Sequence, residues 1–127
     1  MKILYIEDGD INQRVMRRVV TRMGHDLLQA ADGAAGYLLA KTQPDLILLD
    51  IHLPDVNGLD LARRLRAEKI RMPIIVVTSD LINYTRESVL EAGCEDFIGK
   101  PFEPEAMVQL IERYLTSERA TRQQPEA

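Results

Sequence analysis

Residues 46–50 read Leu-Ile-Leu-Leu-Asp, a run of large apolar residues that ends directly in a carboxylate. Residues 74–78 read Ile-Ile-Val-Val-Thr, a β-branched run that ends in a hydroxyl. Short apolar runs without polar alternation are typical of strands that are buried on both faces of a parallel sheet. The two runs therefore predict a parallel sheet that is covered by helices.

Strand and helix patterns alternate on both sides of these runs. Shorter or weaker apolar runs predict further strands over residues 3–6, 27–31 and 96–98. Apolar residues at helical spacing predict helices over residues 11–23, 34–42, 58–68, 82–92 and 107–114. Five successive strand–helix pairs predict a doubly wound α/β fold with right-handed crossovers.

Length and composition indicate one folded domain. The chain has 127 residues, of which 46% are hydrophobic and 28% are charged, and this composition excludes global disorder. Residues 117–127 lack large apolar side chains, so we expect a domain over 1–116 and a disordered polar tail over 117–127.

The charge balance and the single cysteine limit the partners and the compartment. Sixteen basic and twenty acidic residues give a formal charge of −4, which argues against direct nucleic-acid binding. No apolar run approaches the roughly 20 residues that span a membrane, so we expect no membrane insertion. One cysteine cannot form an internal disulfide and fits a reducing compartment. We therefore expect a cytoplasmic protein.

Polar side chains follow the predicted strands, and functional groups gather at these strand ends in an open parallel sheet. The side chains are Glu7, Asp8, Asp50, Thr78 and, just beyond the last strand, Lys100. Any one of them alone is an ordinary loop residue or helix cap. Three carboxylates in one pocket, however, repel each other unless a cation lies among them. A hard cation such as Mg²⁺, assisted by the lysine, would resolve that repulsion.

A phosphoryl group suits such a pocket, because its transfer depends on positioning and on neutralising charge. An aspartate can be the nucleophile and form an aspartyl phosphate. The metal and the lysine can neutralise the phosphoryl oxygens, and a hydroxyl can donate a hydrogen bond to one of them.

Four segments carry a resemblance to a known family. They are Tyr-Ile-Glu-Asp at 5–8, Leu-Leu-Asp-Ile-His-Leu-Pro-Asp-Val-Asn-Gly at 48–58, Val-Val-Thr-Ser at 76–79, and Ala-Gly-Cys-Glu-Asp-Phe-Ile-Gly-Lys-Pro at 92–101. Because the four segments occur in this order and at suitable spacings, the chain from Lys2 to about Leu115 resembles a response-regulator receiver domain of bacterial two-component signalling, of the stand-alone type. The resemblance implies a flavodoxin-like doubly wound (βα)5 fold with a five-stranded parallel sheet of order 2-1-3-4-5.

The resemblance also implies a metal site. Asp8 and Asp50 would bind Mg²⁺ directly, with Mn²⁺ as an alternative, and Glu7 would act mostly through metal-bound water. The backbone carbonyl of His52 would be a further ligand. The imidazole of His52 has no second histidine near it in the sequence, so a multi-histidine site has little support.

The remaining roles concern the phosphoryl group and the response to it. The resemblance implies that Asp50 is the phosphoacceptor, that Thr78 donates its hydroxyl to the phosphoryl group and that Lys100 pairs with it. Phe97 occupies the place of an aromatic residue that turns inward on activation, so Thr78 and Phe97 form the implied switch. The Lys100–Pro101 bond is expected to be cis, as is usual in the family.

The implied activity is that of a signalling switch. Asp50 would accept its phosphoryl group from a sensor histidine kinase or a histidine phosphotransfer protein, and a downstream protein would read the phosphorylated state. The protein would not otherwise be an enzyme: its own chemistry would be Mg²⁺-dependent phosphotransfer and slow autodephosphorylation.

Several rival functions share parts of this pattern. A metal-dependent phosphatase with an aspartate nucleophile normally has a second acid at the position of His52. A flavodoxin-like cofactor binder needs a Ser-, Thr- and Gly-rich loop where this chain has acidic residues at 7–10. A DNA-binding regulator would need a further domain. A receiver fragment of a larger hybrid kinase would have the same sequence pattern, so it stays an alternative to the stand-alone switch.

Two positions depart from the commonest family pattern or vary within it. His52 lies two residues after Asp50, where family members often have Asn or Met, and Asp80 lies two residues after Thr78. At the rim of the pocket their side chains could meet across the entrance, and an aspartate partner would favour the imidazolium. Such a pair could narrow the approach of water to the acyl phosphate or could orient that water, and both side chains could instead point into solvent. We expect the pair to slow hydrolysis.

Overall fold

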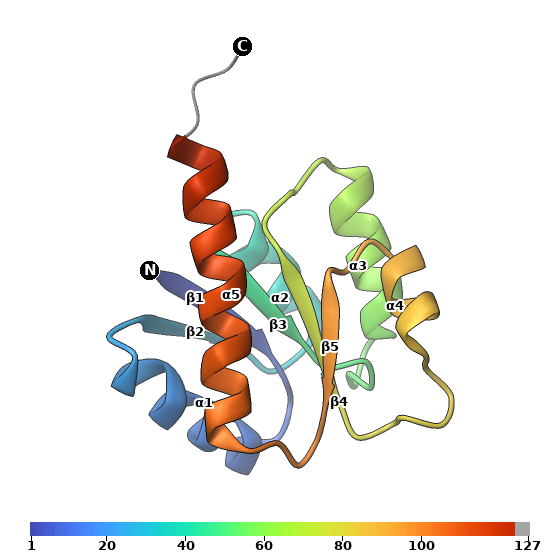
Figure 1. Cartoon of the computed structure of the whole chain (residues 1–127). Coiled ribbons are helices and arrows are strands. Elements are labelled where there is room, and N and C mark those ends of the chain that lie inside the picture. The colour runs from blue at the N-terminus through green and yellow to red at the C-terminus, as the bar shows by residue number, and fades with distance from the viewer. Residues whose placement is uncertain (124–127) are drawn as a thin grey trace.

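The computed structural model describes the backbone of residues 1–123 and the side chains of residues 1–116. The strands are β1 (Lys2–Ile6), β2 (Asp26–Ala30), β3 (Leu46–Leu49), β4 (Ile74–Thr78) and β5 (Asp96–Gly99). They form one parallel sheet in the order β2-β1-β3-β4-β5, which confirms the predicted fold class (Figure 1).

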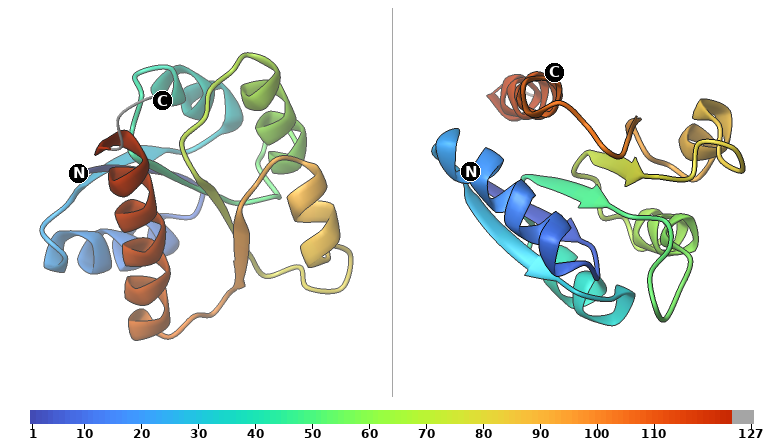
Figure 2. Two further views of the ribbon diagram at one scale, coloured as in Figure 1. Left: turned by 45° about the horizontal axis from the view of Figure 1, so that its top comes forward. Right: turned by 90° about the horizontal axis from the view of Figure 1, so that it is seen from below.

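Helices cover both faces of this sheet. They are α1 (Asp10–Arg22), α2 (Gly33–Ala40), α3 (Gly58–Ala67), α4 (Arg86–Glu91) and α5 (Pro104–Gln123). One buried cluster joins the sheet to α2, α3 and α4, and the other joins it to α1 and α5. Figure 2 shows these two helical layers on opposite sides of the sheet.

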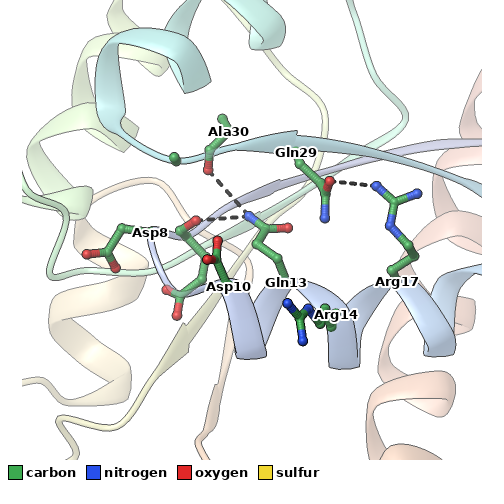
Figure 3. A pocket seen from close by; sticks show the side chains of 9 residues that line it. Asp8, Asp10, Gln13, Arg14, Arg17, Gln29 and Ala30 are labelled. Carbon is green, nitrogen blue, oxygen red and sulfur yellow. Dashed lines mark hydrogen bonds between the residues drawn. The ribbon is translucent and has the colours of Figure 1, made fainter.

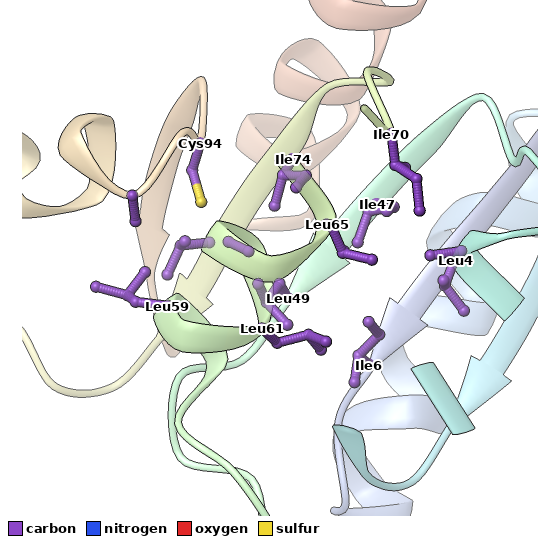
Figure 4. Packing of buried hydrophobic residues seen from close by; sticks show 14 of the residues in the cluster. Leu4, Ile6, Ile47, Leu49, Leu59, Leu61, Leu65, Ile70, Ile74 and Cys94 are labelled. Atoms are coloured by element: carbon purple, nitrogen blue, oxygen red, sulfur yellow. The ribbon is translucent and has the colours of Figure 1, made fainter. Parts of the chain in front are cut away.

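The central strands contribute side chains to both clusters in alternation. Ile47 and Leu49 point into the cluster below α2–α4, whereas Leu46 and Leu48 point into the cluster below α1 and α5. All four residues of β3 are fully buried, which explains why their run contains no polar residue. Figure 4 shows Leu49 and Ile74 packed against Leu61 and Leu65 of α3.

Helix α4 is shorter than expected. The sequence pattern predicted a helix over 82–92, but the helix begins at Arg86. Thr85 is its N-cap, and Thr85 and Ser88 satisfy each other's backbone N–H groups in a capping box. Asn83 instead donates its backbone N–H to the Asp80 carboxylate, which holds residues 79–85 as a loop.

Helix α5 is longer than the apolar stripe at 107–114 indicated. It runs to Gln123, and its backbone is helical in part of the segment that we expected to be a disordered tail. No glycine or proline interrupts residues 105–123, and most of the last residues are good helix formers. The rest of the expected tail, 124–127, lies outside the described residues. No helix in residues 1–123 is long and apolar enough to cross a membrane.

A guanidinium group ties α3 to the segments that lead into β4 and β5, at the end of the sheet opposite the polar strand ends. Arg66 donates hydrogen bonds to the backbone carbonyls of Gly93, Ile70 and Met72. Its remaining nitrogen lies 3.0 Å from both carboxylate oxygens of Glu95. Glu95 in turn accepts a hydrogen bond from the backbone N–H of Ile74 at the start of β4.

Candidate functional site

Three carboxylates meet at the carboxyl ends of β1 and β3. One oxygen each of Glu7, Asp8 and Asp50 lie within 4.8 Å of one another. Glu7 and Asp50 directly follow neighbouring strands, which accounts for their approach. Glu7 and Asp50 are only 2% and 6% exposed, whereas Asp8 is exposed. The cluster therefore has two buried carboxylates below one that faces the surface.

Lys100 supplies a positive charge to this cluster. Its Nζ lies 3.2 Å from Glu7 Oε1 and 3.5 Å from Asp50 Oδ2, and its side chain is 13% exposed. The Lys100–Pro101 peptide bond is cis, as expected. The backbone N–H of Lys100 donates to the backbone carbonyl of Thr78, which ties the loop after β5 to β4. One ammonium balances only one of the three carboxylates.

Glu7 shows why a further cation fits here. Asn12 donates a side-chain hydrogen bond to Glu7 Oε1, while Glu7 Oε2 is buried with no hydrogen-bond partner among the described residues. Burial and the neighbouring Asp50 raise the pKa of Glu7. A buried carboxylate oxygen without a donor, beside two further carboxylates, fits a divalent cation with its bound water.

The backbone at Asp50 lies so close to Gly58 that no side chain fits at position 58. A Cβ atom on Gly58 would lie 2.2 Å from the backbone oxygen of Asp50. The glycine N–H donates to the carbonyl of Ile51. Glycine at the start of α3 therefore lets the β3–α3 loop close against the strand end.

Thr78 and Phe97 lie on the strands next to this cluster. Thr78 ends β4, is fully buried, and its Oγ1 accepts a hydrogen bond from the backbone N–H of Asp80. Phe97, in β5, is partly buried and packs against the cluster below α2, α3 and α4. Thr78 therefore stands at the strand end beside the cluster, whereas Phe97 lies two residues before the end of β5, opposite Val76 of β4.

The His52 imidazole lies outside the acidic cluster and contacts Asp80 instead. Its Nε2 is 2.9 Å from Asp80 Oδ2, which confirms that these two side chains meet. The His52 side chain is 58% exposed. Hydrogen bonds from Asn83, and then from His52, lower the pKa of Asp80 to about 2.

Sequence reasoning missed several residues around the site. Gln13 is buried and donates to the carbonyls of Tyr5, Glu7 and, more weakly, Ala30. These bonds hold α1 against the ends of β1 and β2 (Figure 3). The same face borders a cavity of about 470 Å³. The available sequence signal for Asn12 and Gln13 was their position near the start of the predicted helix 11–23, just after the acidic residues that end the first strand.

The comparisons with known proteins identify the family. The profile of the response regulator receiver domain matches residues 3–112. The chain belongs to the response regulator receiver domain family. This receiver domain is 36% identical over 120 residues to a chemotaxis protein CheY homolog of Campylobacter jejuni, covering 91% of this chain and 92% of the relative. It is 32% identical over 116 residues to the polar-differentiation response regulator DivK of Brucella ovis, covering 89% and 94%.

Solved structures agree with this assignment. The receiver domain is similar to that of a sensor histidine kinase from Pseudomonas aeruginosa, with a TM-score of 0.82, 32% identity, and coverage of 91% of this chain and 97% of the other. That crystal structure holds a magnesium ion in its active-site cleft. A CheY-like receiver domain from Methanospirillum hungatei, with a TM-score of 0.85, 24% identity, and coverage of 94% and 97%, shares the fold.

Proposed function

We propose that this receiver domain, a phosphorylation-controlled signalling switch, accepts a phosphoryl group on the Asp50 carboxylate. The observation that carries the proposal is the approach of Asp50 to two other carboxylates and to Lys100 at one set of strand ends. The donor is a histidine kinase or a histidine phosphotransfer protein, and a downstream protein reads the result. A reducing cytoplasm suits these partners and the buried, unpaired Cys94.

The acidic cluster supports a divalent cation, Mg²⁺ or Mn²⁺. Asp8 and Asp50 would hold it directly, the backbone carbonyl of His52 would complete the protein ligands, and Glu7 would bind its water. The cation would neutralise charge on the phosphoryl oxygens. The magnesium ion in the similar Pseudomonas aeruginosa receiver domain supports this choice of metal.

Phosphoryl transfer uses the other residues of the site directly. An Asp50 oxygen forms a bond to phosphorus while the bond from phosphorus to the donor nitrogen breaks, and that nitrogen keeps the electron pair. The Lys100 ammonium, already 3.5 Å from Asp50, pairs with a phosphoryl oxygen. Thr78 then turns its hydroxyl toward another phosphoryl oxygen and gives up the hydrogen bond from the Asp80 N–H.

The site gives less support to a metal-dependent phosphatase. Such an enzyme needs a second acid two residues beyond its nucleophile, and here that residue is His52, whose side chain is paired with Asp80. Hydrolysis of the aspartyl phosphate is therefore a slow self-catalysed reaction rather than turnover of an external substrate.

Phosphorylation of Asp50 is tested by intact-mass spectrometry after incubation with acetyl phosphate and Mg²⁺. We expect the wild-type protein to gain one phosphoryl group and Asp50→Ala to gain none, because that variant lacks the nucleophile. Asp60→Ala is the control, because Asp60 is an exposed aspartate in α3 whose side chain forms an ion pair with Arg63, away from the acidic cluster. Wild-type protein without added mass, or equal labelling of Asp50→Ala, would contradict the proposed function.

The response to phosphorylation is expected to concentrate in the segment from Thr78 to the loop after β5. Helix α4 has only six residues, and exposed apolar side chains that a partner could cover lie in the preceding loop (Leu81 and Ile82) and in the helix itself (Leu90). Coupling between the phosphoryl site and such a surface typically amounts to about 1–3 kcal/mol. We expect NMR shift changes on phosphorylation to cluster in residues 78–102, with Phe97 among them.

The same protein without Mg²⁺ and acetyl phosphate is the reference for this NMR measurement. Shift changes that stay within the acidic cluster, with α4 and Phe97 unaffected, would show that the domain carries a phosphoryl group without switching.

A further inference from the structure

The β3–α3 loop is bonded to the start of helix α2 by one carboxylate. The loop comprises residues 50–57 and carries Asp55 near its tip. Asp55 Oδ1 accepts a hydrogen bond of 2.7 Å from the backbone N–H of Gly33, and Asp55 Oδ2 accepts one of 3.0 Å from the N–H of Ala34. Asp55 therefore joins the loop that follows the phosphorylation site to a helix on the neighbouring part of the sheet.

The two N–H groups belong to the first turn of α2. The first N–H groups of a helix have no partner within the helix, and a carboxylate is a favourable acceptor for them. Asp32, the N-cap residue of α2, accepts from the N–H of Ala35. Asp55 accepts from the other two, so carboxylates from two separate segments cap this turn. Hydrogen bonds to the backbone, above all the one from Gly33, lower the pKa of Asp55.

The loop and the helix are in close contact where these bonds form. A Cβ atom on Gly33 would lie 2.3 Å from Val56 Cγ2 and 3.1 Å from Asp55 Oδ1. Glycine at the first position of α2 therefore lets the loop approach the helix backbone. The Asp55 side chain itself is exposed, so a variant that lacks its carboxylate opens no cavity in the core.

The same loop borders the acidic cluster. Asp8 and residues 51–57 line one cavity of about 470 Å³. The backbone closes the base of the loop, where His52 and Asn57 form an antiparallel bridge. His52 lies in this base, three residues before Asp55. The position of its backbone carbonyl therefore depends on how the rest of the loop is held.

We infer that Asp55 is a positioning residue of the metal site, which holds the β3–α3 loop in the conformation that lets the His52 backbone carbonyl bind the cation. This inference rests on the proposed function, which assigns that carbonyl to the metal. Asp55 is not a member of the acidic cluster found among the described residues, and it acts only through the loop. Without its carboxylate, part of the free energy of metal binding is used to order the loop, and the metal binds more weakly.

The first test is calorimetric titration of the metal-free protein with Mn²⁺ or Mg²⁺ alone. We expect Asp55→Ala to weaken metal affinity by roughly three- to tenfold, which is less than the roughly 10–100-fold for a group that bonds directly to a metal ligand. Labelling by acetyl phosphate should slow in parallel at low Mg²⁺ and return to the wild-type rate at saturating Mg²⁺, because Asp50, Thr78 and Lys100 are unchanged. A rate that stays low at saturating Mg²⁺ would overturn the inference.

NMR of the metal-free protein gives a second readout. In Asp55→Ala the amides of Gly33 and Ala34 are expected to exchange with solvent faster than in the wild type, because they lose their acceptor. Shift changes should extend from the start of α2 through the loop to His52. Shift changes that stay within residues 33–35 and the mutated position would show that the loop conformation does not depend on Asp55.

Two variants separate loop positioning from helix stability and from charge. Asp32→Ala removes the other cap of α2 but lies outside the loop, so it is expected to lower stability against urea and to keep the wild-type metal affinity. Asp55→Asn removes the charge but keeps an oxygen that can accept from the Gly33 N–H, so it is expected to lose less metal affinity than Asp55→Ala.

The other results also decide the matter. Wild-type metal affinity in Asp55→Ala would overturn the inference. Equal losses in Asp55→Ala and Asp32→Ala would assign the effect to the stability of α2, and equal losses in Asp55→Ala and Asp55→Asn would assign it to charge. Either result would overturn the positioning role while leaving Asp50 as the phosphoacceptor. Failure of the wild-type protein to bind metal and to take up a phosphoryl group would instead overturn the proposed function.

Discussion

Asp8→Ala is expected to abolish Mg²⁺-dependent phosphorylation of Asp50 while leaving the domain folded. Asp8 is the exposed member of the three-carboxylate cluster, so removing it takes away a direct ligand without opening a cavity in the core. The loss of Mn²⁺ or Mg²⁺ affinity should exceed the roughly 10–100-fold cost of removing an outer-shell partner of a metal site. Calorimetric titration with the metal alone, followed by labelling with acetyl phosphate, measures both effects.

Asp10→Ala is the matched control for this experiment. Asp10 is another exposed acid, two residues further on at the start of α1, and it is not part of the metal-competent cluster. It tests whether general loss of negative charge near the site reduces metal affinity. Equal metal affinity in Asp8→Ala and wild type would exclude Asp8 as a ligand.

Arg66→Met is expected to be the most destabilising single change outside the apolar core. The substitution keeps much of the aliphatic volume but removes the donors for three backbone carbonyls and the partner of Glu95. Because Arg66 and Glu95 are only partly buried, the cost comes mainly from the three backbone carbonyls that lose their donor, and it amounts to about 3 kcal/mol in the free energy of unfolding. Urea denaturation of wild type and variant measures this difference.

The pH dependence of the variant gives a second readout. Burial raises the pKa of Glu95 from the ordinary 4.5, while Arg66 and the Ile74 N–H oppose that rise. A carboxyl group with a raised pKa in the folded state favours folding below its unfolded pKa, and that contribution is lost as pH rises through the folded pKa. Without Arg66 the rise is larger, so Arg66→Met should lose stability more steeply than wild type as pH increases above 4.5.

Two further variants complete this test. Adding Glu95→Gln to Arg66→Met should remove the extra pH dependence, since no carboxylate then remains to be ionised at that position. Arg63→Met is the control on the same helix, because its exposed pair with Asp60 is worth no more than about 0.5 kcal/mol. A stability loss in Arg66→Met as small as that of Arg63→Met would show that the Arg66 network contributes little.

The three central strands were predictable because β1, β3 and β4 are buried on both faces, whereas the edge strands β2 and β5 are only partly buried and gave weaker patterns. An uninterrupted apolar run such as 46–49 or 74–77 has few stable alternatives in a chain of this composition. Helix α4 was predicted too long because its start depends on hydrogen bonds rather than on an apolar stripe. Thr85 and Ser88 stand three residues apart and were the visible sign of the cap.

The sequence alone determined that Glu7, Asp8 and Asp50 would converge, because each follows a strand of one parallel sheet and all such strands end at the same edge. It also placed Thr78 and Lys100 at that edge. These relations follow from the direction of the strands and do not depend on side-chain conformation.

Only the tertiary structure decided how these groups share the space. It buried Glu7 and left Asp8 exposed, and of the alternatives that the sequence left open for His52 and Asp80 it selected their direct contact over exposure to solvent. It also gave Arg66 its partners around Gly93 and Glu95. Such contacts join loops and helices whose separation is set by the packing of whole layers, and local sequence patterns carry no information about that distance.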